Sequence, residues 1–270
     1  MKNHIILPII LFFSMISLNY SLIGCLDESG NLVDSWVALA QNLDYQYYWH
    51  YASTGFVKSP YRLDQTSDGC IMSTMNQLYS PVLNMSNIAY ALYNDDPPPP
   101  AGTASSTYAH AKGVFLFDDT QGFWLIHSKP NWPNSREDGA TPFPDSTYAQ
   151  SLMCITLNTS AYQSIAEAAM VNYPYLYDSY MSSSLIHTVP SFNEWISGGK
   201  SNVPNMTLTF SSRGGVGYTQ FAKSKNWGKD LYEDLVAPGL NQSLFVETWR
   251  LGSGGRLVFM WNVLYEYILV

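Results

Sequence analysis

Short runs of branched and aromatic residues, separated by turn-forming residues, recur along the chain and predict a sheet. Such side chains suit a pleated, half-buried surface. The predicted strands are 33–39, 45–49, 88–93, 110–118, 123–127, 152–157, 206–210 and 244–249. The runs 110–118 and 123–127 flank Asp119-Thr120-Gln121-Gly122, and two apolar runs around a glycine-containing turn predict a β-hairpin.

Two segments have helical patterns. One covers 160–172, where Gln163 follows Ser160 at the spacing of a capping box. The other covers 229–236, and Ala237-Pro238-Gly239 is predicted to end it. Strands outnumber helices and the two alternate, so the sequence predicts a mixed α/β fold.

The N-terminus predicts a secretory signal peptide over residues 1–24. Lys2 precedes an apolar run at 5–16, which is too short for a membrane span. Ser21 and Gly24 offer two cleavage edges. The stretch Leu22-Ile23-Gly24-Cys25 also resembles a bacterial lipoprotein processing box, an alternative interpretation. No later stretch of the sequence has ~18 consecutive apolar residues, so we expect no membrane span.

Composition and charge narrow the classes of function. The 270 residues are 46% hydrophobic, which fits a globular chain with a sizeable core. Only 13% of the residues are charged. Tyr, Ser, Asn and Thr supply the polar surface instead, as is common in extracellular proteins. A net charge of −8 excludes a protein that wraps nucleic acid through bulk positive charge. A polyanion needs a local basic site or acid pH, where protonating the five histidines changes −8 to −3.

Three cysteines, Cys25, Cys70 and Cys154, have spacings that fit no zinc or redox motif. In an oxidising compartment they allow one pair and one free thiol. Four glycosylation sequons support secretion. They begin at Asn84, Asn158, Asn205 and Asn241.

The strongest chemical candidate is His110-Ala111-Lys112. On a strand, residues two apart point to the same face, about 6.5–7 Å apart. An imidazole can attack phosphorus or protonate a leaving oxygen, while an ammonium holds a non-bridging oxygen. Such a site needs no metal. The alternative is an exposed strand face that carries two polar residues.

Several stretches around and beyond this pair match known motifs. They are His110-Ala111-Lys112-Gly113-Val114, the run 122–131, Asp27-Glu28-Ser29-Gly30, Leu92-Tyr93-Asn94-Asp95, Phe221-Ala222-Lys223 and the run 227–232. Together they resemble the deoxyribonuclease II family from about residue 25 to residue 257.

The resemblance implies an acid endonuclease that cuts DNA without a metal or other cofactor and is secreted or lysosomal. It implies a sheet with flanking helices similar to the phospholipase D superfamily, in which two halves each supply a His-x-Lys motif. One histidine becomes a phosphohistidine and the other acts as general acid. His110 and Lys112 match the catalytic pair of the first half. His127 matches a further histidine implicated in activity, or alternatively supports packing at a strand end.

The resemblance also implies a disulfide between Cys25 and Cys154, which removes the need for the lipoprotein interpretation and leaves Cys70 unpaired. Asp118 has the strand parity of His110 and Lys112, but the resemblance gives it no role.

The chain departs from the family in its C-terminal part. The family's second motif, His-Ser-Lys followed by an aromatic residue in the C-terminal half, has no match there. The expected organisation is a signal peptide (1–24), a first half with the His-x-Lys motif (25–190), the start of a second half (191–257) and a non-matching apolar tail (258–270). We therefore expect a C-terminally truncated member.

Two functions remain in competition. The first is an acid endodeoxyribonuclease with DNA as substrate, acting through His110 and Lys112. The second is a catalytically defective secreted homologue that binds DNA or a protein. One imidazole lies on only one side of phosphorus, so we expect an inactive monomer or a homodimer that rebuilds the paired site.

Overall fold

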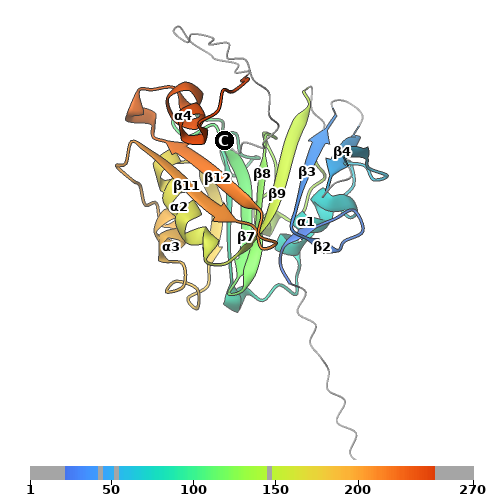
Figure 1. Ribbon diagram of the computed structural model, residues 1–270. Coiled ribbons are helices and arrows are strands. Elements are labelled where there is room, and N and C mark those ends of the chain that lie inside the picture. Colours follow the sequence, from blue (N-terminus) through green and yellow to red (C-terminus); the bar gives the residue numbers. More distant parts are fainter. Residues whose placement is uncertain (1–21, 42–44, 52–54, 145–147, 247–270) are drawn as a thin grey trace, which may run out of the picture.

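The computed structural model describes residues 22–41, 45–51, 55–144 and 148–246. Eight of the described strands form one antiparallel sheet in the order β10-β6-β7-β8-β9-β3-β4-β5 (Figure 1). Their bounds are β3 (Ser35–Ala40), β4 (Tyr47–His50), β5 (Val57–Lys58), β6 (Ile88–Asn94), β7 (Lys112–Asp118), β8 (Gln121–His127), β9 (Gln150–Asn158) and β10 (Leu176–Met181). The mixed α/β prediction is confirmed.

Two further strand pairs and several helices accompany this sheet. The pairs are β1 (Cys25–Leu26) with β2 (Leu32–Val33), and β11 (Asn205–Ser211) with β12 (Gly217–Lys223). The α-helices are α1 (Gly69–Tyr79), α2 (Ala161–Asn172), α3 (Pro190–Ile196) and α4 (Ala237–Leu240). Short helical turns cover Met85–Asn87, Arg136–Asp138, Lys225–Trp227 and Tyr232–Val236.

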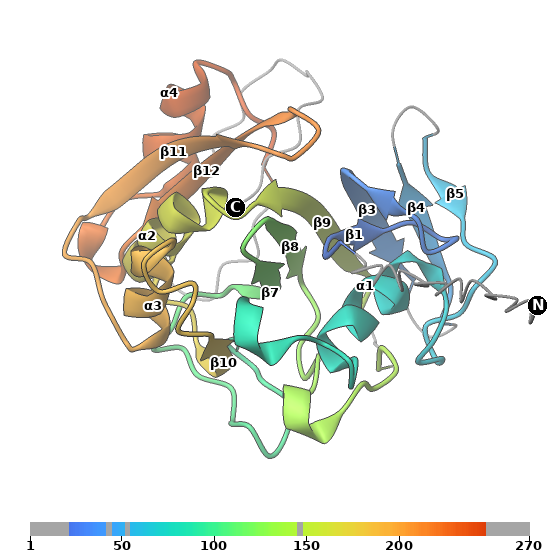
Figure 2. The ribbon, with the colours of Figure 1, turned by 90° about the horizontal axis from the view of Figure 1, so that it is seen from below.

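Both faces of the sheet are buried. Helix α1 lies toward one face, while α2, α3 and the β11–β12 hairpin lie toward the other (Figures 1 and 2). On the first face Leu92 and Val114 share a core with Met75 of α1. On the second, Phe117 stacks on Tyr162 of α2 with ring centroids 4.0 Å apart. This double burial explains why the central strands are apolar almost without alternation.

The predicted hairpin is formed by β7 and β8. The Asp118 carboxylate closes its turn by accepting hydrogen bonds from the N–H groups of Thr120 (2.7 Å) and Gln121 (2.9 Å). A Cβ at Gly122 would lie 2.1 Å from the Leu116 carbonyl oxygen, so the close approach of the two strands requires glycine there. Asp118 therefore has a turn-forming role.

The strands predicted at 88–93, 123–127, 152–157 and 206–210 are confirmed, with ends that differ by a few residues. The run 33–39 is instead split at Asp34, between β2 and β3. The Asp34 carboxylate accepts hydrogen bonds from the Gly214 N–H and the Ser212 hydroxyl, which tie this break to the β11–β12 turn.

Two helix predictions are wrong in detail. Ser160 makes no side-chain cap bond in the described structure, and the Gln163 amide instead donates to Glu167 (3.0 Å) and Ser191. The C-terminal helical segment begins later than predicted and continues through Pro238 to Leu240. The π-helical turn Tyr232–Val236 shifts the hydrogen-bond register before Pro238, where a regular α-helix would break.

Leu244, Phe245 and Val246 form no strand, and the remainder of the predicted strand 244–249 lies outside the described residues. The apolar tail 258–270 and most of the predicted signal peptide also lie outside them. No described helix combines the length and apolar character that a membrane crossing requires.

Cys25 of β1 is bonded to Cys154 of β9, as the resemblance implied, with Cα atoms 5.9 Å apart. The lipoprotein interpretation is wrong because the disulfide occupies the Cys25 thiol. Of the three cysteines, all of which the structure describes, Cys70 is left unpaired and buried.

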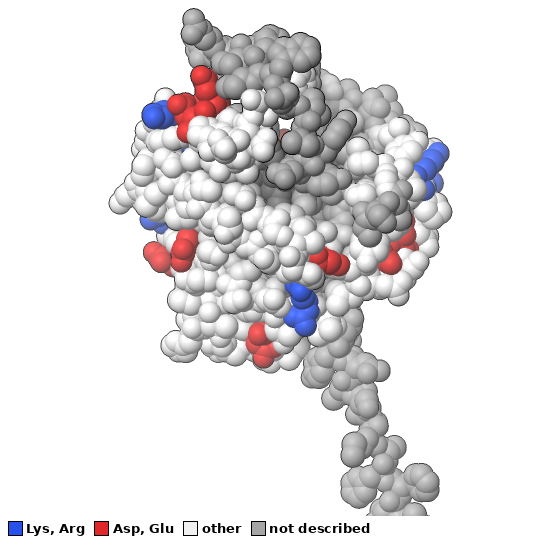
Figure 3. Space-filling model, in the orientation of Figure 1, with Lys and Arg blue, Asp and Glu red and all other residues white. Residues whose placement is uncertain are grey.

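Few charged side chains interrupt the face shown in Figure 3. This agrees with the low charged fraction of 13% and leaves electrostatic recognition to a small number of residues.

Candidate active site

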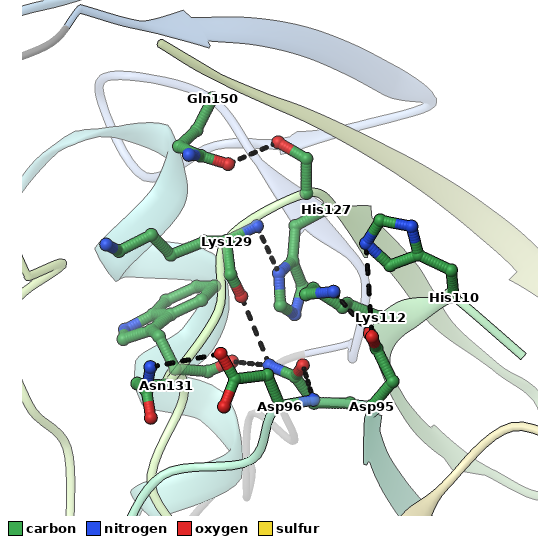
Figure 4. Close-up of polar contacts among 11 residues, drawn as sticks. Asp95, Asp96, His110, Lys112, His127, Lys129, Asn131 and Gln150 are labelled. Atoms are coloured by element: carbon green, nitrogen blue, oxygen red, sulfur yellow. Dashed lines mark hydrogen bonds and ion pairs between the residues drawn. The ribbon is translucent and has the colours of Figure 1, made fainter. Parts of the chain in front are cut away.

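His110 and Lys112 meet at one carboxylate rather than on one strand face (Figure 4). Strand β7 begins at Lys112, and the chain before it turns, with the Ala111 N–H bonded to the Ala109 carbonyl oxygen (2.8 Å). The His110 side chain is 87% exposed, whereas that of Lys112 is only 4% exposed. The prediction that both residues lie on the strand 110–118 is therefore wrong.

Asp95 brings the two side chains together. The Lys112 ammonium donates a hydrogen bond to Asp95 Oδ1, and His110 Nε2 lies 3.9 Å from Asp95 Oδ2. Asp95 directly follows β6, whose last residue, Asn94, pairs with Lys112. Strand pairing thus puts the carboxylate beside the motif. A sequence signal existed, because Asp95 follows a strand run, but it did not show which strand β6 would pair with.

The loops after β6 and β8 are joined through Asn94. Its buried side-chain amide donates to the carbonyl oxygens of Lys129 (3.1 Å) and Trp132 (2.9 Å). Its side-chain oxygen accepts the Asp96 N–H (2.9 Å). These bonds satisfy polar groups in a buried position and fix the place of Asp95 relative to the end of β8.

His127 is the last residue of β8 and is buried. Its Nδ1 accepts the Lys129 N–H (3.2 Å), so in the neutral ring Nε2 carries the proton. Nε2 finds no hydrogen-bond partner in the part of the chain that the structure describes. Burial, helped by the nearby Lys112 charge, lowers the pKa of His127 to about 3. At mildly acid pH His127 is therefore a neutral hydrogen-bond donor.

The His-x-Lys spacing recurs at His127 and Lys129, but it does not form a second pair of the same kind. Strand β8 ends at His127, and the Lys129 ammonium lies 5.7 Å from the centroid of the Phe143 ring. Figure 4 shows the two side chains pointing in different directions.

A cavity of about 480 Å³ opens where the candidate residues meet. His110, Lys112 and His127 line it together with aromatic residues of the sheet and its cover. The aromatic residues are Tyr93, Phe115, Trp124, Trp195 and Phe221. Gln220 of β12 also lines the cavity, and its buried Oε1 has no hydrogen-bond partner among the described residues.

The site joins an exposed imidazole, an ammonium paired with a carboxylate, and a neutral imidazole N–H at one cavity. This set can bind an anionic ester, attack it and hold its non-bridging oxygens. Within the described ranges, no group of three or more His, Cys, Asp or Glu residues is arranged to hold a metal ion.

Comparison with known proteins identifies the family of the chain. A sequence profile described as Deoxyribonuclease II matches residues 24–259. Deoxyribonuclease-2-alpha of Sus scrofa is 34% identical over 194 residues, covering 70% of this chain and 52% of that protein. Plancitoxin-1 of Acanthaster planci is 34% identical over 193 residues, covering 70% and 53%. Cell death-related nuclease 6 of Caenorhabditis elegans is 31% identical over 265 residues, covering 91% and 68%.

The chain spans about half the length of the first two of these relatives. The family profile nevertheless covers most of its residues, including every residue of the candidate site. The chain belongs to the deoxyribonuclease II family.

Proposed function

We propose that the protein is an acid endodeoxyribonuclease that hydrolyses DNA phosphodiester bonds through His110, with no metal in the reaction. The observation that carries this proposal is the contact of one carboxylate, Asp95, with both His110 and Lys112, two residues that line the cavity. Family membership supports a deoxyribonuclease II-like hydrolytic function.

His110 is the nucleophile in this proposal. A ring nitrogen forms a bond to phosphorus while the bond from phosphorus to the leaving sugar oxygen breaks, and that oxygen takes up a proton. Water then attacks phosphorus and breaks the P–N bond, which frees the histidine. The exposure of His110 suits a polymeric substrate, which cannot enter a closed cavity.

Lys112 and His127 stabilise charge on the phosphate. The Lys112 ammonium and the His127 Nε2–H can each donate to a non-bridging oxygen. Because the pKa of His127 is lowered to about 3, it donates a hydrogen bond but does not supply the proton to the leaving oxygen. That proton comes from a donor on the side of phosphorus opposite His110.

Acid pH favours the encounter with DNA. Lys112 and Asp95 cancel each other's charge, so this pair adds no net negative charge that would repel a phosphate. Protonation of carboxylates and histidines elsewhere also reduces the repulsion between DNA and a chain of net charge −8.

We expect the purified protein to nick supercoiled plasmid at about pH 5 in the presence of a chelator. His110→Ala should abolish nicking, and Lys112→Met should remove most of the rate. His187→Ala is the matched control, because His187 is an exposed histidine outside the cavity. A requirement for magnesium, or equal activity of the His110 variant, contradicts the mechanism. DNA binding without any cleavage favours the catalytically defective homologue.

We also propose a secreted or lysosomal location. The Cys25–Cys154 disulfide supports passage through an oxidising compartment. Asn84, Asn158 and Asn241 are exposed, so three of the four sequons are accessible to a glycosyl transferase.

A further inference from the structure

Three tyrosine rings stack beside His110. Tyr108 precedes His110 by two residues, and Tyr173 and Tyr175 lie between α2 and β10. The Tyr108 ring centroid lies 5.0 Å from that of Tyr173 and 4.5 Å from that of Tyr175, the latter with planes 9° apart. The Ala109 N–H donates to the Tyr173 carbonyl oxygen (3.1 Å), which anchors the stacked rings next to His110.

A lysine accompanies these rings. The ammonium of Lys200, an exposed residue, lies 3.9 Å from the centroid of the Tyr173 ring. An ammonium over a ring still directs N–H groups away from it, toward solvent or an anion. All three side chains are only partly buried, and the Tyr173 ring is covered by Tyr108 and by the exposed side chain of Lys200.

The backbone of Tyr173 adds an independent observation. Tyr173 ends α2 in the left-handed conformation, with φ 58°. Glycine or asparagine normally occupies such a position, because a Cβ makes it unfavourable. A tyrosine in this place adds a ring and a hydroxyl where the backbone alone favours another residue. Unfavourable backbone conformations of this kind cluster at ligand sites.

We propose that Tyr108, Tyr173, Tyr175 and Lys200 form a nucleotide-binding subsite that holds the DNA strand next to the phosphate attacked by His110. The Lys200 side chain moves off the Tyr173 ring to pair with a phosphate, and a base packs against the ring face that it leaves. This inference rests on the proposed function, because His110 defines the bond that is cut.

The chemistry points to an unpaired nucleotide. Bases in a duplex already stack on each other, whereas an unpaired base has a free face for an aromatic ring. Every base has such a face, so the subsite tolerates different sequences. In a chain of net charge −8, a single exposed ammonium beside the cut is a substantial local attraction for phosphate.

The test measures binding separately from cleavage. In the full chain with His110→Ala, fluorescence anisotropy follows a labelled single strand of about 12 nucleotides at about pH 5 with a chelator. Tyr173→Asn should weaken binding about tenfold, since stacking contributes at that level for each base. The melting temperature should not fall, because asparagine accepts the left-handed conformation.

Tyr45→Asn is the matched control. Tyr45 also has a positive φ (55°) and a cation near its ring, with the Arg62 guanidinium 5.7 Å from the centroid. It precedes β4, and β8, β9 and β3 separate β4 from β7 in the sheet. This variant should bind the strand as the parent does.

Two further binding experiments separate the contribution of the base from that of the phosphate. On a strand of abasic sites, Tyr173→Asn and the parent should bind equally, because no base remains to stack. Lys200→Gln should lower the slope of log affinity against log salt concentration by the amount of about one phosphate contact. If Tyr173→Asn lowers the melting temperature, the result of the Lys200→Gln variant decides whether the subsite exists.

Unchanged binding in both the Tyr173 and Lys200 variants overturns the subsite, as does an equal loss in the Tyr45 control. If Tyr173→Asn weakens binding in the His110→Ala chain but the unsubstituted chain never cuts DNA, the proposed nuclease function fails and the subsite stands. If the unsubstituted chain cuts DNA but the Tyr173 and Lys200 substitutions leave binding normal, the nuclease function stands and the subsite fails.

Discussion

Asp95 sets the charge balance of the candidate site. Lys112 is almost fully buried, and a buried ammonium keeps its charge only beside a partner. The same carboxylate lies near the exposed His110 ring, which it can orient for attack on phosphorus. His127 has the opposite character, since it is buried and its lowered pKa keeps it neutral.

The protonation of His127 predicts a stability that depends on pH. Its pKa is about 3 in the folded chain and about 6.5 when unfolded, so between these values only the unfolded chain takes up the proton. The free energy of unfolding therefore falls as pH falls through this range, and the loss from pH 7 to pH 5 is about 2 kcal/mol. Urea unfolding at both pH values measures it.

His127→Gln should reduce that loss by a similar amount, while exchange of the exposed His187 for glutamine should leave it unchanged. If the parent and the His127 variant lose stability equally toward acid pH, the neutral state assigned to His127 is wrong.

At the scale of secondary-structure elements, strand pairing and hydrogen bonds between loops determine which residues lie at the candidate site. The β6–β7 pairing places Asp95 beside Lys112, and the Asn94 amide joins the loops after β6 and β8. Next to α2, the β11–β12 hairpin brings Gln220 to the cavity. The Cys25–Cys154 disulfide fixes the N-terminal strand pair to the central sheet.

That disulfide should contribute strongly to stability. It joins residues separated by 129 positions, for which the chain-entropy model gives roughly 4–5 kcal/mol. Replacing both cysteines with alanine should lower the free energy of unfolding by about that amount. Denaturant unfolding of the parent and the double variant measures it. A Cys70→Ala variant, which breaks no disulfide, is the control, and an equal loss there contradicts the prediction.

The N-terminal segment predicts where the leader is cleaved. Ile23 is buried and its carbonyl oxygen accepts the Gln121 side-chain amide (2.7 Å), while the Gly24 N–H bonds to Gln77 (3.1 Å). Cleavage after Gly24, where the sequence predicts the end of the signal peptide, would remove these contacts, so we propose cleavage after Ser21 instead. Mass spectrometry of the secreted chain should find Leu22 as the first residue, and a chain that starts at Cys25 would contradict this.

For the molecule as a whole, the proposed mechanism needs groups on both sides of the phosphate. The low charged fraction leaves little long-range attraction for DNA, so the local cations matter more. The proton for the leaving oxygen requires a donor opposite His110, and the neutral His127 cannot supply it.

We therefore expect the nicking activity to reside in a homodimer, in which a second copy supplies the opposing histidine, and a monomer of the 270-residue chain to be inactive. Size-exclusion chromatography, with the acid nicking assay on each fraction, tests this expectation. Activity confined to a dimer fraction supports the paired site. Strong cleavage by a strictly monomeric fraction shows that one His-x-Lys pair suffices.

Much of the fold followed from local sequence. The strands at 88–93 and 152–157 were predictable because long apolar runs bounded by turn residues leave few other structures. Helix α1 was missed although Ile71, Met75 and Leu78 have helical spacing, because the segment begins with glycine and has no Glu or Gln at the third helical position to complete a capping box. The prediction at 33–39 failed because Asp34 accepts hydrogen bonds from Ser212 and Gly214, which are far away in the sequence.

The amino-acid sequence by itself determined the family, and that resemblance singled out His110 and Lys112 and implied the pairing of Cys25 with Cys154. Family motifs depend on residue types at fixed spacing, which can be recognised without knowledge of distant contacts. Only the tertiary structure decided that Asp95 joins His110 to Lys112, that His127 is neutral, and that Tyr108 meets Tyr173 and Tyr175. Each of these results from strand pairing or burial between segments far apart in the chain, and local pattern does not specify such contacts.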